Sequence, residues 1–232
     1  MKNLIVAPFA KIIGFIFLSM LSIFKSPGLT LIFLSVAVNI ILLPFYYLAE
    51  RIEKKERDIQ DKMKPKIDEF KSVYKGYELH LYVKNVYRLH GYKPIYSLRG
   101  LISLLIQLPF FMGAYYYLSS YSGFQGIGFL FLNDLSKADA LLSFAGLQIN
   151  ILPFLMTFLN LASGFVYSKG KEAKDKITIV VIALLFLVIL YNSPSSLLIY
   201  WTFNNLFSLI KNLVLIKLEA KKKKEGGPVR AG

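Results

Sequence analysis

The side chains that could do chemistry in this chain are amides, hydroxyls and aromatic tips placed inside long apolar segments. Such groups form hydrogen bonds, and in hydrocarbon each one left unpaired costs free energy. On a helix, Ser35 and Asn39 share a face, as do Trp201, Asn204 and Asn205. This spacing fits two interpretations: a water-accessible groove lined by amides, or hydrogen bonds that join neighbouring helices. The candidate groove residues are Ser35, Asn39, Gln107, Asn160, Tyr200, Trp201, Asn204 and Asn205.

Covalent and metal chemistry have no candidate residues in the sequence. The chain has no cysteine, and its two histidines, His80 and His90, lie in a polar segment where solvated side chains are expected. We find no phosphate-binding loop, nucleophile elbow or cluster of metal ligands. The interior of the apolar segments lacks Asp, Glu, Arg and His, and Lys211 lies near the end of the last segment. We therefore expect no enzyme activity, metal or cofactor, and an ion-coupled transporter is disfavoured.

The apolar segments themselves predict an integral membrane protein. Of the 232 residues 55% are hydrophobic, and the mean hydropathy is +0.51. The apolar residues are clustered in windows that approach or reach the roughly 20 residues needed to cross hydrocarbon about 30 Å thick. Five transmembrane helices are predicted, over residues 28–49, 98–121, 147–167, 177–191 and 197–216.

The first segment, residues 4–24, is apolar but is interrupted by Pro8, Lys11 and Gly14. A lysine near the middle of a spanning helix costs roughly 2.5–3.5 kcal/mol on insertion scales, whereas in an interfacial helix it reaches the headgroups. A cleaved signal peptide is the rival interpretation, but no clear small-residue cleavage site follows the apolar run. We favour an interfacial helix that lies along the membrane surface.

The loop charges predict the orientation of the chain. The net charge is +14, and lysine and arginine are concentrated in the polar block 50–97, in the loop 169–176 and at the C-terminus. The loop 122–146 carries only Lys137, and the turn 192–196 carries no lysine or arginine. Basic loops stay in the cytoplasm, so five spans place the N-terminus outside and the C-terminus inside. A six-span topology, in which residues 4–24 also cross, keeps the same loop assignment and places both termini inside. The positive loops are expected to meet anionic lipid or ribosomal RNA rather than DNA.

The polar block 50–97 has the pattern of two amphipathic helices. An apolar stripe runs through Ile59, Met63, Ile67 and Phe70 among charged residues, and Gly76 ends it. A second stripe follows in Leu79, Val83, Val86 and Leu89. We expect a folded helical hairpin rather than a simple charged loop, and Pro65 predicts a kink or a boundary within its first helix.

Five short segments follow one another in a recognisable order and at fitting spacing. The first two are Met63-Lys64-Pro65-Lys66-Ile67 and Val86-Tyr87-Arg88 with Pro94, in which Met63, Pro65, Lys66, Tyr87 and Arg88 mark the hairpin. The others are Gln107-Leu108-Pro109 within 105–111, Asn133-Asp134-Leu135-Ser136 within 131–136 with Asp139 and Pro153, and Pro194 to Trp201 with Asn205. Together they resemble the YidC/Oxa/Alb family of membrane insertases over nearly the whole chain.

The resemblance implies a fold, a location and a function. The expected organisation is all-α: an extracytoplasmic interfacial amphipathic helix (1–26), transmembrane helix one (27–49), a cytoplasmic helical hairpin (50–97), transmembrane helices two to five (98–217) and a basic cytoplasmic tail (218–232). The expected protein is a multi-pass bacterial inner-membrane insertase and chaperone that passes clients through a hydrophilic groove. Its implied partners are nascent membrane proteins and lipid, together with the ribosome, reached by the tail and hairpin, and the Sec translocon.

Two departures from the family pattern are visible. The family usually has an arginine in the groove where this chain has Asn39, and Ile95-Tyr96 follow Pro94 where a double glycine is common. The missing arginine keeps a second interpretation open, a specialised paralogue that assembles one membrane complex without general insertase activity. A small transporter is the third.

Overall fold

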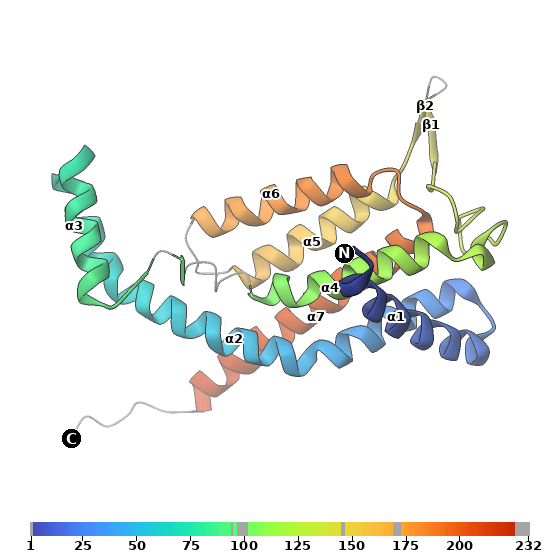
Figure 1. Cartoon of the computed structure of the whole chain (residues 1–232), viewed down its shortest axis with the longest axis horizontal. Coiled ribbons are helices and arrows are strands. Elements are labelled where there is room, and N and C mark those ends of the chain that lie inside the picture. Colours follow the sequence, from blue (N-terminus) through green and yellow to red (C-terminus); the bar gives the residue numbers. More distant parts are fainter. Residues whose placement is uncertain (1, 94, 97–101, 145–146, 169–172, 226–232) are drawn as a thin grey trace. The chain divides into compact units, whose positions relative to one another are not determined.

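The computed structural model describes residues 2–93, 95–96, 102–144, 147–168 and 173–225, and these are mainly helical (Figure 1). The all-α prediction is confirmed. The elements are α1 (Lys2–Phe24), α2 (Pro27–Val73), α3 (Gly76–Leu89), α4 (Ile102–Ser120), η2 (Ser122–Phe124), β1 (Leu142–Phe144), β2 (Leu147–Ile149), α5 (Leu152–Tyr167), α6 (Ala173–Leu190) and α7 (Ser195–Glu225). They form two units, one of Met1–Ile40 with Met112–Gly232 and one of Ile41–Phe111.

In the larger unit, α1 packs closely against the end of α4 through glycines. A Cβ atom added at Gly113 would lie 2.7 Å from the backbone carbon of Phe9, and one at Gly14 would lie 2.6 Å from the Tyr117 ring. Phe17 is fully buried, and its ring meets those of Tyr117, Tyr121 and Phe124 edge-on at centroid distances of 5.8, 5.1 and 5.5 Å. One face of α1 is therefore held by aromatic packing.

The opposite face of α1 is apolar and exposed, as Phe15 at 74% and Ile23 at 73% illustrate, and Lys11 is exposed among these residues. Among the residues that the structure describes, two helices are long and apolar enough to cross a membrane, Val6–Phe24 and Pro27–Val73. Leu152–Val166 and Lys176–Leu190 are shorter apolar helices. The interfacial placement of α1 stays a prediction.

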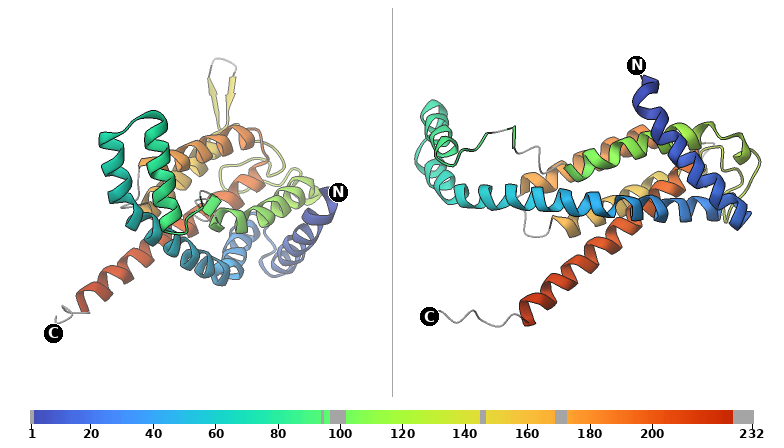
Figure 2. Two further views of the ribbon diagram at one scale, coloured as in Figure 1. Left: turned by 60° about the vertical axis from the view of Figure 1, so that its left-hand side comes forward. Right: turned by 60° about the horizontal axis from the view of Figure 1, so that its bottom comes forward.

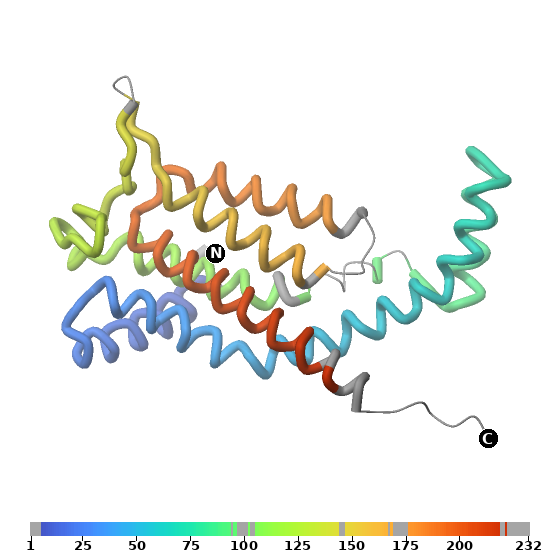
Figure 3. The backbone as a smooth tube through the Cα atoms, turned by 180° about the vertical axis from the view of Figure 1, so that it is seen from behind, coloured from blue at the N-terminus to red at the C-terminus, as the bar shows by residue number. Residues whose placement is uncertain are grey.

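Helices α5, α6 and α7 lie side by side (Figure 3). Gly164 of α5 brings α6 close, because an added Cβ atom would lie 2.5 Å from the Ile179 side chain. Trp201 of α7 stacks on Phe186 of α6 with ring centroids 5.7 Å apart. The start of α7 is held by two backbone hydrogen bonds to the α4–α5 loop, from Ser195 N–H to the Lys137 carbonyl (2.7 Å) and from Ser196 N–H to the Leu135 carbonyl (2.9 Å).

Three predicted boundaries differ from the structure. Helix α2 is continuous through Pro44 and Pro65, so of the two alternatives predicted at Pro65, a kink or a boundary, the boundary is wrong. The lysine and glutamate residues around Pro65 are good helix formers. Residues 147–149 form strand β2 rather than the start of a span, and α5 begins at Leu152, where Pro153 fits the first helical turn. Helix α7 extends beyond residue 216 to Glu225. Residues 98–101 of the predicted second span, and Pro94, lie outside the described residues.

In the smaller unit, α3 folds back against the last part of α2 (Figure 2). Met63, Val86 and Tyr92 are buried together and are covered by apolar residues of both helices. Phe70 and Tyr82 stack across the pair with centroids 4.9 Å apart. The other residues singled out in this region are less buried: Tyr87 is half-buried, whereas Pro65, Lys66 and Arg88 are exposed.

A hydrogen-bonded carboxylate supports this pairing of helices. The Tyr92 hydroxyl donates to Glu56 Oε1 at 2.6 Å, and Gln60 Nε2 donates to the same oxygen at 3.0 Å. Glu56 is only 2% exposed, so its charge depends on these donors. Burial, with the Glu56 hydrogen bond as a smaller cause, raises the pKa of Tyr92 to about 12. Tyr92 therefore stays protonated and donates its hydrogen bond at neutral pH.

We predict that Tyr92→Phe loosens α3 from α2, because the buried Glu56 carboxylate loses a donor that is worth about 1.5–3 kcal/mol for a charged acceptor. Faster hydrogen exchange at the amides of α3 is the expected result. Tyr77→Phe is the matched control, since Tyr77 is 75% exposed. Equal exchange in the two variants would show that the hydroxyl of Tyr92 does not hold the helices together.

Candidate functional site

Asparagine side chains join α7 to its neighbours in the larger unit, and we call Asn39, Asn160, Asn204, Asn205 and Asn212 the asparagine seam. Asn39 of α2 donates to the side-chain oxygen of Asn204 and to the Ser35 carbonyl at 2.8 Å. Asn160 of α5 donates to the side-chain oxygen of Asn205 at 3.2 Å. The seam therefore links α7 to α2 on one side and to α5 on another.

The seam continues further along α5 and α7. Asn212 Nδ2 donates to both the carbonyl and the hydroxyl oxygen of Ser163, each at 3.2 Å. Asn205 Nδ2 also donates to the Met156 carbonyl at 3.4 Å. Sequence reasoning missed Asn212 and Ser163. Asn212 lies seven residues after Asn205, two helical turns along the same face, and this periodicity is the signal that could have identified it.

The residues that link α2 to α7, together with Ser35, are buried rather than open to water. Ser35 is 0% exposed, and Asn39 and Asn204 are each 2% exposed. Of the two interpretations of their spacing, this geometry is that of hydrogen bonds between helices. An amide carries both donors and an acceptor, so two facing asparagines satisfy one another where apolar side chains surround them. An open groove at these residues requires that the α2–α7 contact separate.

The structure does not bring all predicted groove residues together. Trp201, Asn204 and Asn205 were expected on one face, but their side chains meet α6, α2 and α5 respectively. Helix α7 has neighbours on several sides, so residues within a single turn contact different helices. Tyr200 is 1% exposed and Trp201 is 4% exposed. Gln107 is half-buried on α4 and belongs to the unit Ile41–Phe111, not to the unit that contains the seam.

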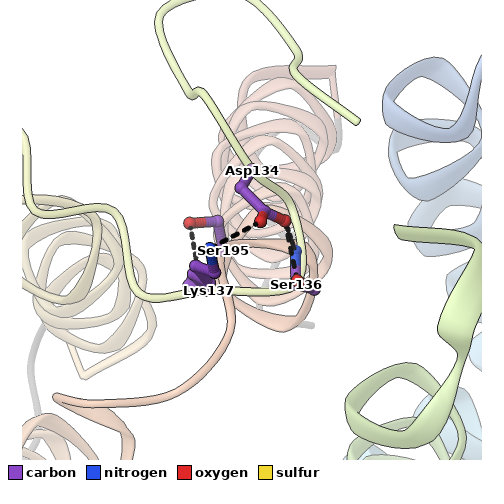
Figure 4. Close-up of polar contacts among 4 residues, drawn as sticks. All are labelled: Asp134, Ser136, Lys137 and Ser195. Atoms are coloured by element: carbon purple, nitrogen blue, oxygen red, sulfur yellow. Dashed lines mark hydrogen bonds and ion pairs between the residues drawn. The ribbon is translucent and has the colours of Figure 1, made fainter. Parts of the chain in front are cut away.

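A polar cluster in the α4–α5 loop holds the start of α7 (Figure 4). Ser136 donates to Asp134 Oδ1 from its hydroxyl at 2.7 Å and from its N–H at 2.9 Å, and Lys137 lies 3.3 Å from the same carboxylate. The hydroxyl of Ser136 is the largest of the influences that lower the pKa of Asp134 to about 2. The Ser195 hydroxyl donates to the Lys137 carbonyl at 2.7 Å. The loop thus fixes the N-terminus of α7, and with it the register of the seam.

The site has the chemistry of a neutral hydrogen-bonding surface. Within the described part of the chain, no three histidine or carboxylate side chains gather as a metal site requires. The side chains of the seam are amides, so the seam can exchange hydrogen bonds with a polar segment but offers that segment no charge.

Comparison with known proteins gives relatives along nearly the whole chain. The membrane protein insertase YidC of Treponema denticola is 28% identical over 226 residues, which are 91% of this chain and 38% of that protein. The YidC of Clostridium perfringens is 27% identical, over 95% of this chain and 92% of that protein. The insertase MisCB of Bacillus subtilis is 27% identical, over 85% of this chain and 74% of that protein. The chain thus spans well under half of the Treponema denticola protein and nearly all of the Clostridium perfringens one.

A solved structure also has the same fold. The crystal structure of an active YidC insertase with its first transmembrane domain resolved matches 88% of this chain and 45% of that chain, with a TM-score of 0.56 and 24% identity. The family model described as 60Kd inner membrane protein matches residues 19–224. With most of its length covered by that model, the chain belongs to the 60Kd inner membrane protein family, in which the YidC insertases are found.

Proposed function

We propose that this protein is a membrane protein insertase and chaperone, which inserts client membrane proteins without covalent chemistry or a cofactor. The observation that carries the proposal is the similarity to proteins named as membrane protein insertases, one of which is matched over nearly its full length. The asparagine seam supports the proposal from the structure, because it places exchangeable hydrogen bonds among apolar helices.

We propose that five helices cross the bilayer: the first part of α2, then α4, α5, α6 and α7. In this arrangement α1 lies along the outer surface, and the end of α2 with α3 forms a cytoplasmic hairpin. The N-terminus is outside, and the basic tail 218–232 is in the cytoplasm. The distribution of lysine and arginine supports this orientation, because the basic segments 50–97 and 218–232 then lie on one side of the membrane.

The mechanism we propose is an exchange of hydrogen bonds at the seam. A client helix must bring its polar flank through hydrocarbon, where each uncompensated polar group costs several kcal/mol. Interhelical hydrogen bonds in membranes contribute on average only about 0.6 kcal/mol each. An exchange in which polar groups of the client replace the Asn39–Asn204 hydrogen bond leaves no amide unpaired, so its net cost is small. The apolar client segment then partitions into lipid, and its burial drives the step.

Two short helices reduce the distance that the client must cross. With 16 residues, α5 is about 24 Å long at 1.5 Å per residue, and α6 has 18 residues. Both are shorter than the roughly 30 Å of hydrocarbon that a span normally crosses. A bilayer that thins to match them shortens the path of the polar flank.

The exposed basic residues of the hairpin suggest further partners. Lys66 and Arg88 are exposed on α2 and α3, and the tail carries the lysine run 221–224. A polyanion such as ribosomal RNA fits this charge, which supports the ribosome as a partner. The Sec translocon is a further candidate.

A second candidate function is favoured by one observation. Asn39 is neutral, and it occupies the position where the family usually has an arginine, so clients with acidic flanks gain no ion pair here. A paralogue that assembles one particular membrane complex would need no such general attraction. Growth of an insertase-depleted cell on this protein separates the two functions: rescue supports the general insertase, and failure supports the specialised one.

The dependence of insertion on the charge of the client can be measured after reconstitution of the protein into proteoliposomes. The client has a single membrane span and a short translocated tail that carries either aspartates or asparagines. We expect the wild-type protein to insert the asparagine-tailed client above the level of empty liposomes. Asn39→Arg should raise crosslinking and insertion of the aspartate-tailed client, since it adds a positive charge at the seam. No insertion of either client above empty liposomes would contradict the proposed function.

The opening of the seam can be tested by locking it. The chain has no cysteine, so Asn39→Cys with Asn204→Cys can be joined specifically by a short thiol–thiol crosslinker. We expect the unbridged double variant to insert less than the wild type, because it lacks the two amides. The bridged protein should insert less still and regain the difference when a reducible bridge is cleaved, because α2 and α7 must separate. The control is the same double variant in which each cysteine is blocked by its own monofunctional thiol reagent, so that no bridge joins the two helices. Full insertion by the bridged protein would show that clients use another path.

A further inference from the structure

The β1–β2 hairpin in the α4–α5 loop is amphipathic. Its strands are antiparallel, with Leu142 opposite Ile149, Ser143 opposite Gln148 and Phe144 opposite Leu147. Cross-strand partners lie on the same face of a sheet, and successive residues alternate between faces. Leu142, Leu147 and Ile149 therefore share one face, whereas Ser143 and Gln148 share the other.

The apolar face of this hairpin has no cover among the described residues of the chain. Figures 1 and 3 both show β1 and β2 projecting away from the helices, beyond the ends of α5 and α6. Leu142 is 54% exposed and Leu147 is 70% exposed. A two-stranded hairpin is marginally stable in water unless something packs on its apolar face.

The base of the hairpin is fixed where α5 begins and α6 ends. Asn150 accepts a hydrogen bond from the Ala140 N–H at 3.0 Å and donates one to the Tyr191 carbonyl at 2.9 Å. The Asp139 carboxylate accepts hydrogen bonds from the backbone N–H groups of Ile151 and Leu152, at the N-terminus of α5. Both strands are therefore tied to the ends of two apolar helices.

The outer surface of those helices leads directly to the hairpin. Phe154 of α5 is 47% exposed, and it contacts the ring of Tyr191 with centroids 6.1 Å apart. Val188 and Ile189 of α6, at 76% and 58% exposed, continue this apolar surface. Tyrosine at such a position is typical of the boundary between hydrocarbon and headgroups. No residue from 140 to 152 is charged, so the hairpin can enter that boundary without burying a charge.

We propose that the β1–β2 hairpin lies in the outer leaflet of the bilayer and anchors the α5–α6 pair there. Leu142 and Leu147 face the acyl chains, and Ser143 and Gln148 face water and headgroups. Amphipathic elements of this kind sit about 5–10 Å into the headgroup and acyl boundary. The inference rests on the proposed arrangement in which α5 and α6 cross the membrane, and it adds a lipid-binding surface outside the seam.

Environment-sensitive fluorophores on single cysteines test this placement in the full-length, otherwise cysteine-free chain. Leu147→Cys and Gln148→Cys are neighbours on opposite faces and form the matched pair, reconstituted in phosphatidylcholine nanodiscs. We expect the label at 147 to emit at shorter wavelength than the label at 148. We also expect lipids spin-labelled on the upper part of the acyl chain to quench the label at 147 more strongly, since only this face meets the acyl chains.

Three other results would overturn the proposal or separate it from the arrangement on which it rests. Water-like emission and equally weak quenching at both positions would place the hairpin in solvent. A blue-shifted label at 147 that lipid does not quench would mean that protein, such as a second copy of the chain, covers this face. A third label at Val181→Cys, which is 58% exposed near the middle of α6, tests whether α6 crosses the bilayer. If deeply spin-labelled lipid fails to quench it, the membrane-spanning arrangement itself is wrong.

Discussion

The interaction on which the structure depends is the pairing of amide groups inside an apolar helical assembly. Hydrocarbon offers such groups no partner, so each buried asparagine must find one on a neighbouring helix. Asn204 pairs with Asn39 of α2, and Asn205 pairs with Asn160 of α5. These bonds give α7 a defined rotation and height relative to α2 and α5, which apolar packing alone specifies less sharply.

The start of α7 and its later turns are held differently, and this contrast is compatible with the proposed exchange of hydrogen bonds at the seam. At its start, backbone bonds from Ser195 and Ser196 to the α4–α5 loop fix the helix firmly. The loop is itself stiffened by the Asp134 carboxylate, which gathers Ser136 and Lys137. Further along, the Asn39 amide donates to the side-chain oxygen of Asn204 and links α7 to α2. A helix anchored at one end and weakly bonded along its length can separate from a neighbour without losing its position.

The pattern of apolar and polar residues predicted much of the fold, because hydropathy and helical periodicity are local properties. The pairing of α2 with α3 follows from two apolar stripes, which meet at Met63 and Val86. The pattern was misleading at residues 147–149, where an apolar run was counted as helix. The short segment Leu147-Gln148-Ile149 fits the start of an apolar helix and an amphipathic strand equally well. The choice of strand depends on pairing with 142–144 and on the Asn150 and Asp139 hydrogen bonds.

The sequence by itself determined the class of protein, its helical content and its family, since composition, loop charge and motif order require no knowledge of contacts. Tertiary structure decided which polar residue meets which partner. Trp201, Asn204 and Asn205 lie within little more than one turn, yet they contact three different helices because α7 is surrounded. Periodicity places side chains around one helix, but which neighbour each side chain reaches depends on how separate helices pack, and this information is not local.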